Sequence, residues 1–183
     1  MTYYGGKELA ASFRTVRGNT IQVAQDIPED KYGFRAAPES RTIGETLVHI
    51  ALSSGFQHHI QSNKIGDLQL VNFPELMQKA TAQENVQRSK ADIVTLLTTE
   101  GEKFASFLEG LPESFLGERV TMMPGSEPAT KSRFEMLLSP KEHEMHHRAQ
   151  LMVLQRMCGL TPHLTRQRRE QMAQRAAAAQ AGR

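Results

Sequence analysis

Histidines are the residues of this sequence whose spacing best suits chemistry. The chain has seven, and His143 and His147 are four residues apart in a segment with helical periodicity, which places both rings on one helical face. His49 shares a helical face with Leu52 and Phe56 in an earlier segment. At all three positions the apolar pattern would otherwise place a core residue, so the three imidazoles are expected to point inward.

Three inward-pointing imidazoles from two helices would be difficult to satisfy separately. A buried polar group without a partner costs about 1–3 kcal/mol, whereas a divalent metal would satisfy three nitrogen atoms together, with bonds of about 2.0–2.1 Å for zinc. Three protein ligands leave a coordination position for water or substrate, which is typical of catalytic sites. The alternative is that each histidine is an ordinary hydrogen-bonded core residue, since a pair with this spacing also arises by chance.

The other histidines and the cysteine are expected to lie outside this site. His146 should point to the flank of its helix, His58 and His59 to the surface or rim, and His163 belongs to the C-terminal tail. Cys158 is predicted to be a core residue about three turns beyond the last histidine of the set, and therefore not a nucleophile.

Several polar residues are candidates for supporting roles. Glu45 could orient the first histidine, but it is better explained as part of a helix N-cap. Gln150 is predicted to hydrogen-bond across the bundle, and Arg148 to point to the flank and anchor a neighbouring helix or a carboxylate. Glu142 is interpreted as a cap residue and Glu144 as a solvated one, so no general base is assigned.

The apolar periodicity that must position these residues predicts an all-α protein, a four-helix bundle with long crossover connections. The expected helices cover residues 7–26, 42–60, 84–109 and 131–158. Irregular connections are expected over 62–82, with a short helical turn near Leu76, and over 113–129. Either a new helix begins at Pro140, or the last helix continues through it with a kink.

Two segments resemble those of a known family. His143-Glu-Met-His-His-Arg-Ala-Gln150 is similar to the H-x-x-H-H-R-x-Q signature of the DinB-like (YfiT-type) family of metal-dependent enzymes. Residues 38–51 are similar to the segment leading to that family's first metal histidine. The resemblance covers residues 7–162 and implies a bundle, often a homodimer, with His49, His143 and His147 as ligands of a divalent metal. Ala149 departs from the family, which commonly has glycine there.

The resemblance also implies an activity. Characterised relatives include thiol S-transferases and a thiol-dependent isomerase, so we expect a metal site that activates a low-molecular-weight thiol. A metal-dependent hydrolase, or a non-catalytic stress-response bundle that binds metal or a partner, are the alternatives. Three imidazoles suit zinc or nickel best, with iron, manganese or copper also possible.

Composition excludes several other classes of protein. Hydrophobic residues make up 39% and charged residues 23% of 183, which is enough for one core. No apolar run is long enough to span a membrane, the first residues do not resemble a signal peptide, and the single cysteine excludes an intrachain disulfide. A cytoplasmic protein is therefore expected.

Charge divides the chain into a bundle over residues 1–162 and a basic tail over 163–183. The tail has five arginines and one acid, a net charge of +4, which leaves 17 basic against 19 acidic residues in the body. The tail contains no aromatic residue, so binding of nucleic acid is not expected. It is interpreted as a solvated helix or disordered extension, with an anion-binding arm as the alternative.

Overall fold

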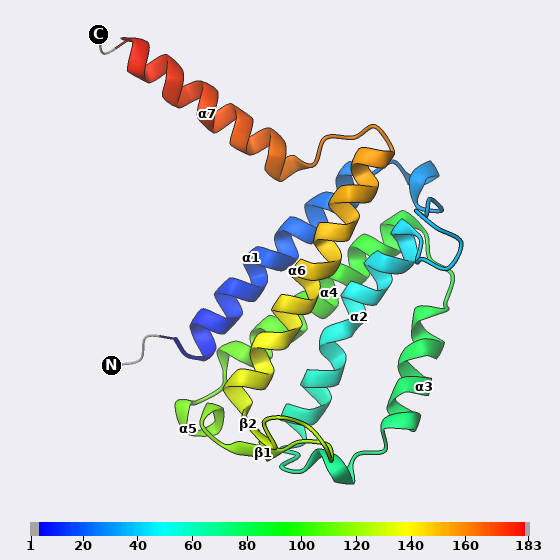
Figure 1. Ribbon diagram of the computed structural model, residues 1–183, viewed down its shortest axis with the longest axis vertical. Coiled ribbons are helices and arrows are strands. Elements are labelled where there is room, and N and C mark those ends of the chain that lie inside the picture. Colours follow the sequence, from blue (N-terminus) through cyan, green and yellow to red (C-terminus); the bar gives the residue numbers. More distant parts are fainter. Residues whose placement is uncertain (1–3, 182–183) are drawn as a thin grey trace.

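Four long helices form a bundle in the computed structural model, which describes residues 4–181 (Figure 1). They are α1 (Gly6–Asp26), α2 (Ile43–Ser62), α4 (Lys90–Glu109) and α6 (Arg133–Met157). Around the bundle, α1 packs on α4, α4 on α2, α2 on α6, and α6 on α1. This arrangement confirms the predicted all-α four-helix bundle.

After α2 ends, a separate helix, α3 (Phe73–Glu84), carries the chain back along the outside of the bundle to the start of α4 (Figure 1). It makes the crossover connection that the sequence predicted, but as a full helix where only a short turn was expected. The predicted helix over 84–109 therefore begins too early, because α4 starts at Lys90. Its N-cap is Ser89, whose hydroxyl accepts from the backbone N–H of Asp92 in a capping box.

The last bundle helix, α6, runs without interruption through Pro140. Its N-cap is Ser132, which forms a capping box with Glu135, so the helix begins one turn or more before the proline. Of the two expectations for Pro140, the start of a new helix is wrong and the continuation of the last helix through it is correct, while a kink there stays a prediction.

Short elements occupy the connections. They are η1 (Glu29–Lys31), η2 (Leu68–Leu70), α5 (Glu113–Leu116), β1 (Arg119–Thr121) and β2 (Thr130–Ser132). The two strands pair antiparallel, with Arg119 opposite Ser132. The segment 113–129, predicted to be irregular, thus contains a helical turn and one strand of a small hairpin.

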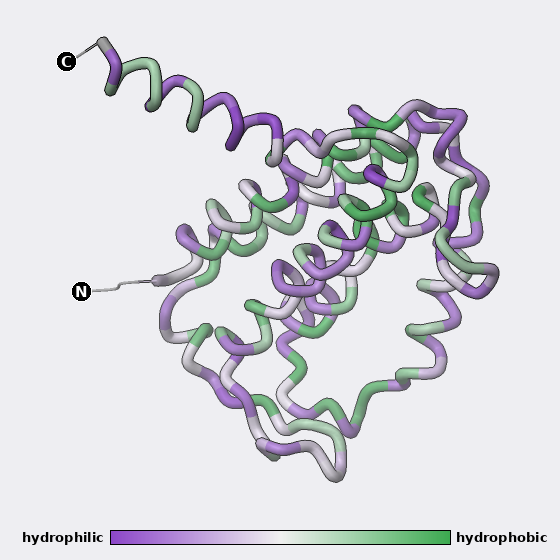
Figure 2. Tube along the Cα trace, turned by 45° about the horizontal axis from the view of Figure 1, so that its top comes forward, coloured by the Kyte–Doolittle hydropathy of each residue, from purple (hydrophilic) through white to green (hydrophobic). Residues whose placement is uncertain are grey.

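The tail forms helix α7 (His163–Ala181), which projects away from the bundle (Figure 1). Its first turn is docked on α1, where the buried His163 ring lies 3.1 Å from Asn19 Oδ1 and Arg166 forms an ion pair with Asp26 at 2.7 Å. From Arg166 onward its described side chains are exposed, and Figure 2 shows the strongly hydrophilic segments along it. The helical form of the tail agrees with one expectation, while Gly182 and Arg183 lie outside the described residues.

The division into units 1–162 and 163–183 stays a prediction. Among residues 4–181, none of the helices is long and apolar enough to cross a membrane.

Candidate metal centre

The three histidines singled out from the sequence come together between α2 and α6. His49 lies on α2, and His143 and His147 lie one turn apart on α6, which packs against α2. His143 Nε2 is 3.2 Å from His49 Nε2 and 3.1 Å from His147 Nε2. Each ring can offer one nitrogen within 4.8 Å of the others, and all three are partly buried. The predicted grouping is therefore present in the structure.

Two of the rings are oriented by an acceptor on their outer nitrogen. Glu84 Oε1 lies 2.8 Å from His49 Nδ1, and Gln150 Oε1 lies 2.9 Å from His147 Nδ1. The amide nitrogen of Gln150 faces His146 Nε2 at 3.1 Å, which is consistent with this orientation of the amide. Because both acceptors require a hydrogen on Nδ1, a neutral ring at either position presents a bare lone pair at Nε2.

The third ring cannot satisfy both lone pairs. A neutral His143 ring has one N–H, so its Nε2 can donate to His49 or to His147 but not to both. Its Nδ1 atom is buried and has no hydrogen-bond partner. Three nitrogen atoms thus converge without enough hydrogen atoms among them, and a cation at their centre would resolve the conflict.

Two of the three separations between the nitrogen atoms match metal coordination, and all three atoms lie within 4.8 Å of one another. Two ligands at tetrahedral angles and bonds of about 2.0–2.1 Å lie about 3.3–3.4 Å apart, close to the observed 3.1 and 3.2 Å. A carboxylate or amide behind a metal-binding histidine is the usual second layer of such sites. The residues present therefore fit a divalent metal held by three imidazoles.

Burial keeps two of these rings ready to bind a cation at neutral pH. Removal from solvent, followed by the charges of His147 and His49, lowers the pKa of His143 from 6.5 to about 4. Burial also lowers the pKa of His147, although its hydrogen bond to Gln150 acts in the opposite direction. Since metal ligands must be deprotonated, no proton competes with a metal at His143 near pH 7.

Glu84 is the functional residue that the sequence analysis missed. It is the last residue of α3, 35 positions from the histidine that it contacts. Its second oxygen lies 3.7 Å from the guanidinium of Arg41. Because residues 84–109 were expected to form one helix, Glu84 had been assigned to the beginning of a helix instead of the end of the crossover, and no local motif distinguishes it.

Three of the five residues expected in supporting roles differ in outcome. Glu45 is the N-cap partner of Thr42, as favoured. Arg148 reaches a neighbouring helix, where Nη1 donates to the Val16 carbonyl at 3.1 Å. Gln150, in contrast, does not bond across the bundle but contacts the histidines of its own helix.

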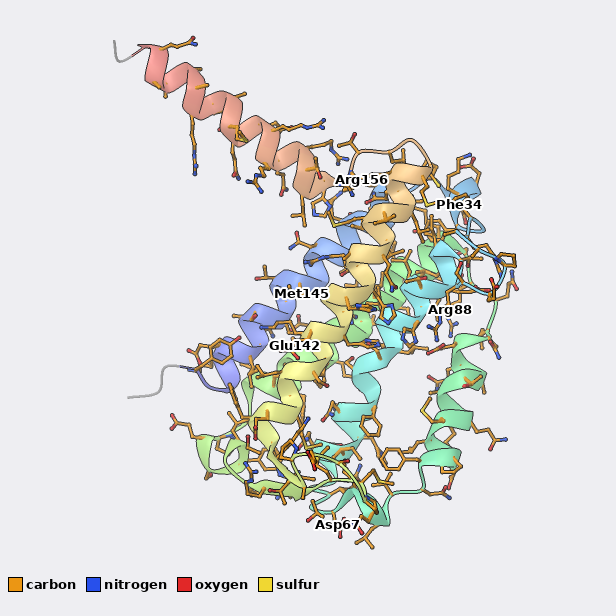
Figure 3. All side chains as sticks on the ribbon, viewed as in Figure 1. Phe34, Asp67, Arg88, Glu142, Met145 and Arg156 are labelled. Carbon is orange, nitrogen blue, oxygen red and sulfur yellow. The ribbon has the colours of Figure 1, made fainter. Side chains whose placement is uncertain are left out.

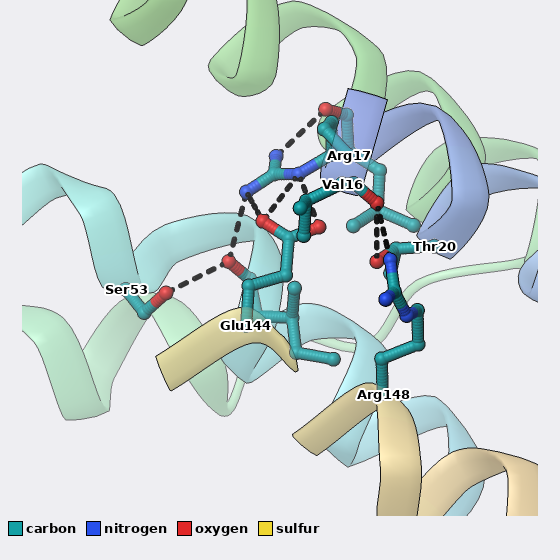
Figure 4. A network of polar contacts seen from close by, with 8 residues as sticks. Val16, Arg17, Thr20, Ser53, Glu144 and Arg148 are labelled. Atoms are coloured by element: carbon teal, nitrogen blue, oxygen red, sulfur yellow. Dashed lines mark hydrogen bonds and ion pairs between the residues drawn. The ribbon is translucent and has the colours of Figure 1, made fainter. Parts of the chain in front are cut away.

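Glu144 was predicted to be solvated, and this was wrong. It is 1% exposed and is paired with Arg17 of α1, whose Nε lies 3.0 Å from Glu144 Oε2 (Figure 4). Arg17 also donates to the carbonyl oxygens of Leu97 and Ile50, at 2.8 and 3.2 Å. One buried ion pair therefore links all four bundle helices.

Glu142 was expected to be a cap residue, which was also wrong, because the cap of α6 lies further upstream. It is exposed, as is Met145 on the same helix, and Figure 3 labels both. Neither Glu142 nor Glu144 is placed to act as a general base at the histidines.

The remaining histidines and the cysteine lie outside the cluster. His146 and His59 are exposed, and His58 packs edge-on against Phe107. Cys158 is the C-cap of α6 and is partly buried against the core. The histidine positions agree with the expected flank and surface roles, whereas Cys158 lies at the edge of the core and not within it.

Comparisons with known proteins place this chain and its fold in a family. A sequence model of the DinB family matches residues 1–180. YjoA of Bacillus subtilis (strain 168), described as an uncharacterized protein, is 26% identical over 154 residues, which cover 84% of this chain and 91% of YjoA. The crystal structure of the DinB-like YjoA protein from Bacillus subtilis superposes with a TM-score of 0.61 at 24% identity, over 84% of this chain and 94% of that one, and shows the same fold. Given the match of nearly its whole length, the chain belongs to the DinB family.

Proposed function

We propose that this protein is a divalent-metal-dependent enzyme whose metal ligands are His49, His143 and His147. The observation that supports this most directly is the convergence of three Nε2 atoms whose hydrogen bonding the protein itself cannot complete. Imidazole ligands suit several transition metals. Zinc or nickel is proposed first, with iron, manganese and copper as alternatives.

The residues around the ligands fix the rings and leave one side open. Glu84 and Gln150 hold His49 and His147 through their Nδ1 atoms. A pocket of about 800 Å³ opens beside His147 and Gln150, a volume suited to a small molecule. One of the three proposed ligands, His147, therefore lines a space that a substrate could enter.

A divalent ion with a free coordination position lowers the pKa of a thiol or of water. A thiol is favoured because a thiol bound to a divalent ion is deprotonated outright, whereas the pKa of bound water falls only to about 7. The resemblance to thiol-dependent relatives points to the same class of substrate.

The proposed reaction is a thiol S-transfer. The sulfur of a low-molecular-weight thiol forms a bond to an electrophilic carbon of a second small molecule, and the leaving group departs with the bonding electrons. The protein would hold the sulfur of the thiol at the histidine cluster, with the second molecule beside it. Hydrolysis of a small molecule at the same site is the second candidate, as the resemblance to the family suggested.

Elemental analysis of untagged protein tests the metal site. We expect about one transition metal per chain in the wild type and none in His143→Ala/His147→Ala. The matched control is His58→Ala/His59→Ala, which removes two histidines of α2 outside the cluster and should retain the metal. If the wild type remains metal-free after incubation with zinc and nickel, the proposal is wrong.

The wider partners are further proposals. We propose a homodimer, which sedimentation of the full chain would test. Salt-dependent binding of DNA that disappeared on deletion of the exposed part of α7 would instead support a nucleic-acid partner. A cytoplasmic location also stays a prediction.

A further inference from the structure

The pocket beside the histidine cluster contains charged residues that the proposed reaction does not use. It lies between the segment that leads into α2 and the C-terminal half of α6, and Arg41 and Glu39 line it together with His147 and Gln150. The apolar side chains of Val153 and Leu154 form another part of its wall. Such a mixture of a few polar groups with apolar surface is typical of small-molecule sites.

Arg41 has donors available for a ligand. Its guanidinium is 3.7 Å from Glu84 Oε2, a contact between charges that is too long for a hydrogen bond. Within residues 4–181, its side chain donates none of the hydrogen bonds found, and it is about half exposed. The positive charge of Arg41 contributes to lowering the pKa of both His143 and His147, so it acts on the same space as the cluster.

The charge balance around this space favours an anion. A divalent cation on three neutral imidazoles and the guanidinium of Arg41 outweigh the carboxylates of Glu39 and Glu84 by one net positive charge. Arginine binds carboxylates through two parallel hydrogen bonds, which fixes the orientation of the ligand.

We propose that Arg41 is the specificity-determining residue of this site and binds the carboxylate of a thiol-bearing small ligand whose sulfur reaches the histidine cluster. This inference rests on the proposed function, because the sulfur end requires the metal. It goes further by naming a second recognition point, at the opposite end of the ligand.

Binding of simple thiols to the cobalt(II)-loaded protein tests the proposal. The probes are ω-mercapto acids of increasing chain length, each compared with the mercapto alcohol of the same length, and binding is followed by the thiolate-to-cobalt absorption band. In the wild type we expect one chain length at which the acid binds about tenfold more tightly than its alcohol. Arg41→Gln should remove this preference, so that the acid and the alcohol of each chain length bind with similar affinity.

Three further variants sharpen the result. Arg35→Gln removes an exposed cation of the same segment that pairs with Glu45, and it should retain the preference. Arg41→Lys keeps the charge without the planar fork and should show an intermediate preference. Glu39→Gln removes the opposing carboxylate and should increase the affinity for the acids.

The outcomes separate this inference from the proposed function. Thiols that bind with equal affinity as acids and alcohols would overturn the inference and leave the metal-thiol proposal standing. A preference that persists in Arg41→Gln would assign the carboxylate to another group. If no thiol binds to the metal-loaded wild type, the thiol function and the inference are both wrong.

Discussion

Two polar clusters that both involve α2 and α6 differ in burial and in how completely their polar atoms are paired. Glu144 is the neighbour of His143 on α6, and the Ile50 carbonyl that binds Arg17 belongs to the neighbour of His49 on α2. The Arg17–Glu144 pair is nearly completely buried, and its charges are matched by each other and by backbone carbonyls. The three histidines are half-buried, adjoin a pocket, and face one another with unmatched nitrogen atoms.

The difference shows how, of two adjacent residues on a helix, one can stabilise the core while the other belongs to a candidate binding site. Successive side chains of a helix diverge by about 100°, so one position enters the bundle interior and the next faces the pocket side. A buried polar network is tolerated when every member is satisfied. The network that is unsatisfied and open is the one that can bind a ligand.

The largest expected effect comes from breaking the satisfied cluster. Glu144→Ala leaves the buried guanidinium of Arg17 without its counter-charge, and we expect it to lower the free energy of unfolding by about 3–5 kcal/mol. Urea denaturation measures this, and Glu142→Ala, an exposed acid on the same helix, is the control. The folded fraction of Glu144→Ala should still bind metal. A loss below about 1 kcal/mol would mean that the ion pair does not hold the helices together.

A smaller effect is expected from crowding the same cluster. A Cβ atom added at Gly101 of α4 would lie 2.7 Å from Arg17 Cγ, and the ion pair prevents that side chain from moving freely. We expect Gly101→Ala to cost up to about 3 kcal/mol in denaturation experiments. At Gly18 of α1 an added Cβ meets nothing within 4 Å, so Gly18→Ala should be neutral or stabilising. Equal effects at the two glycines would contradict the tight packing around Arg17.

Removing the carboxylate that orients His49 should weaken metal binding at the histidine cluster. Glu84→Gln keeps the size of the side chain but loses its charge behind His49, and we expect metal affinity to fall by about 10- to 100-fold, or about 1.4–2.7 kcal/mol. Competition with a chromophoric chelator measures the affinity. Glu75→Gln, at the other end of α3, is the control. Unchanged affinity would show that Glu84 does not orient the ligand.

The pH dependence of the metal-free protein should give the smallest effect, because the rings are only half-buried. The pKa of His143 is about 4 in the folded state and about 6.5 in the unfolded chain. The unfolded state therefore takes up a proton first as the pH falls, and stability is lost between pH 6.5 and about 4. His143→Gln should flatten this part of the stability profile in urea denaturation. A profile identical to that of the wild type would show that His143 does not titrate in this way.

Local features made the long helices and the three histidines predictable. The capping box at Thr42 marks the start of α2, and the spacing of His143 and His147 places both rings on one face of α6 wherever that helix lies. The boundary at Lys90 was missed because the apolar pattern was extended to Val86, which is 54% exposed. Periodicity alone does not distinguish a residue before a helix from one within it.

What the sequence by itself determined is the four bundle helices, their apolar faces and the candidate ligands, because these depend on residues within a few turns of one another. What only the tertiary structure decided is which polar residues become partners. Glu144 is 127 positions from Arg17, and Glu84 is 35 positions from His49. The environment of such a carboxylate depends on which helices pack against it, and a charge becomes a buried ion pair or a support for a ligand only when the chain has folded.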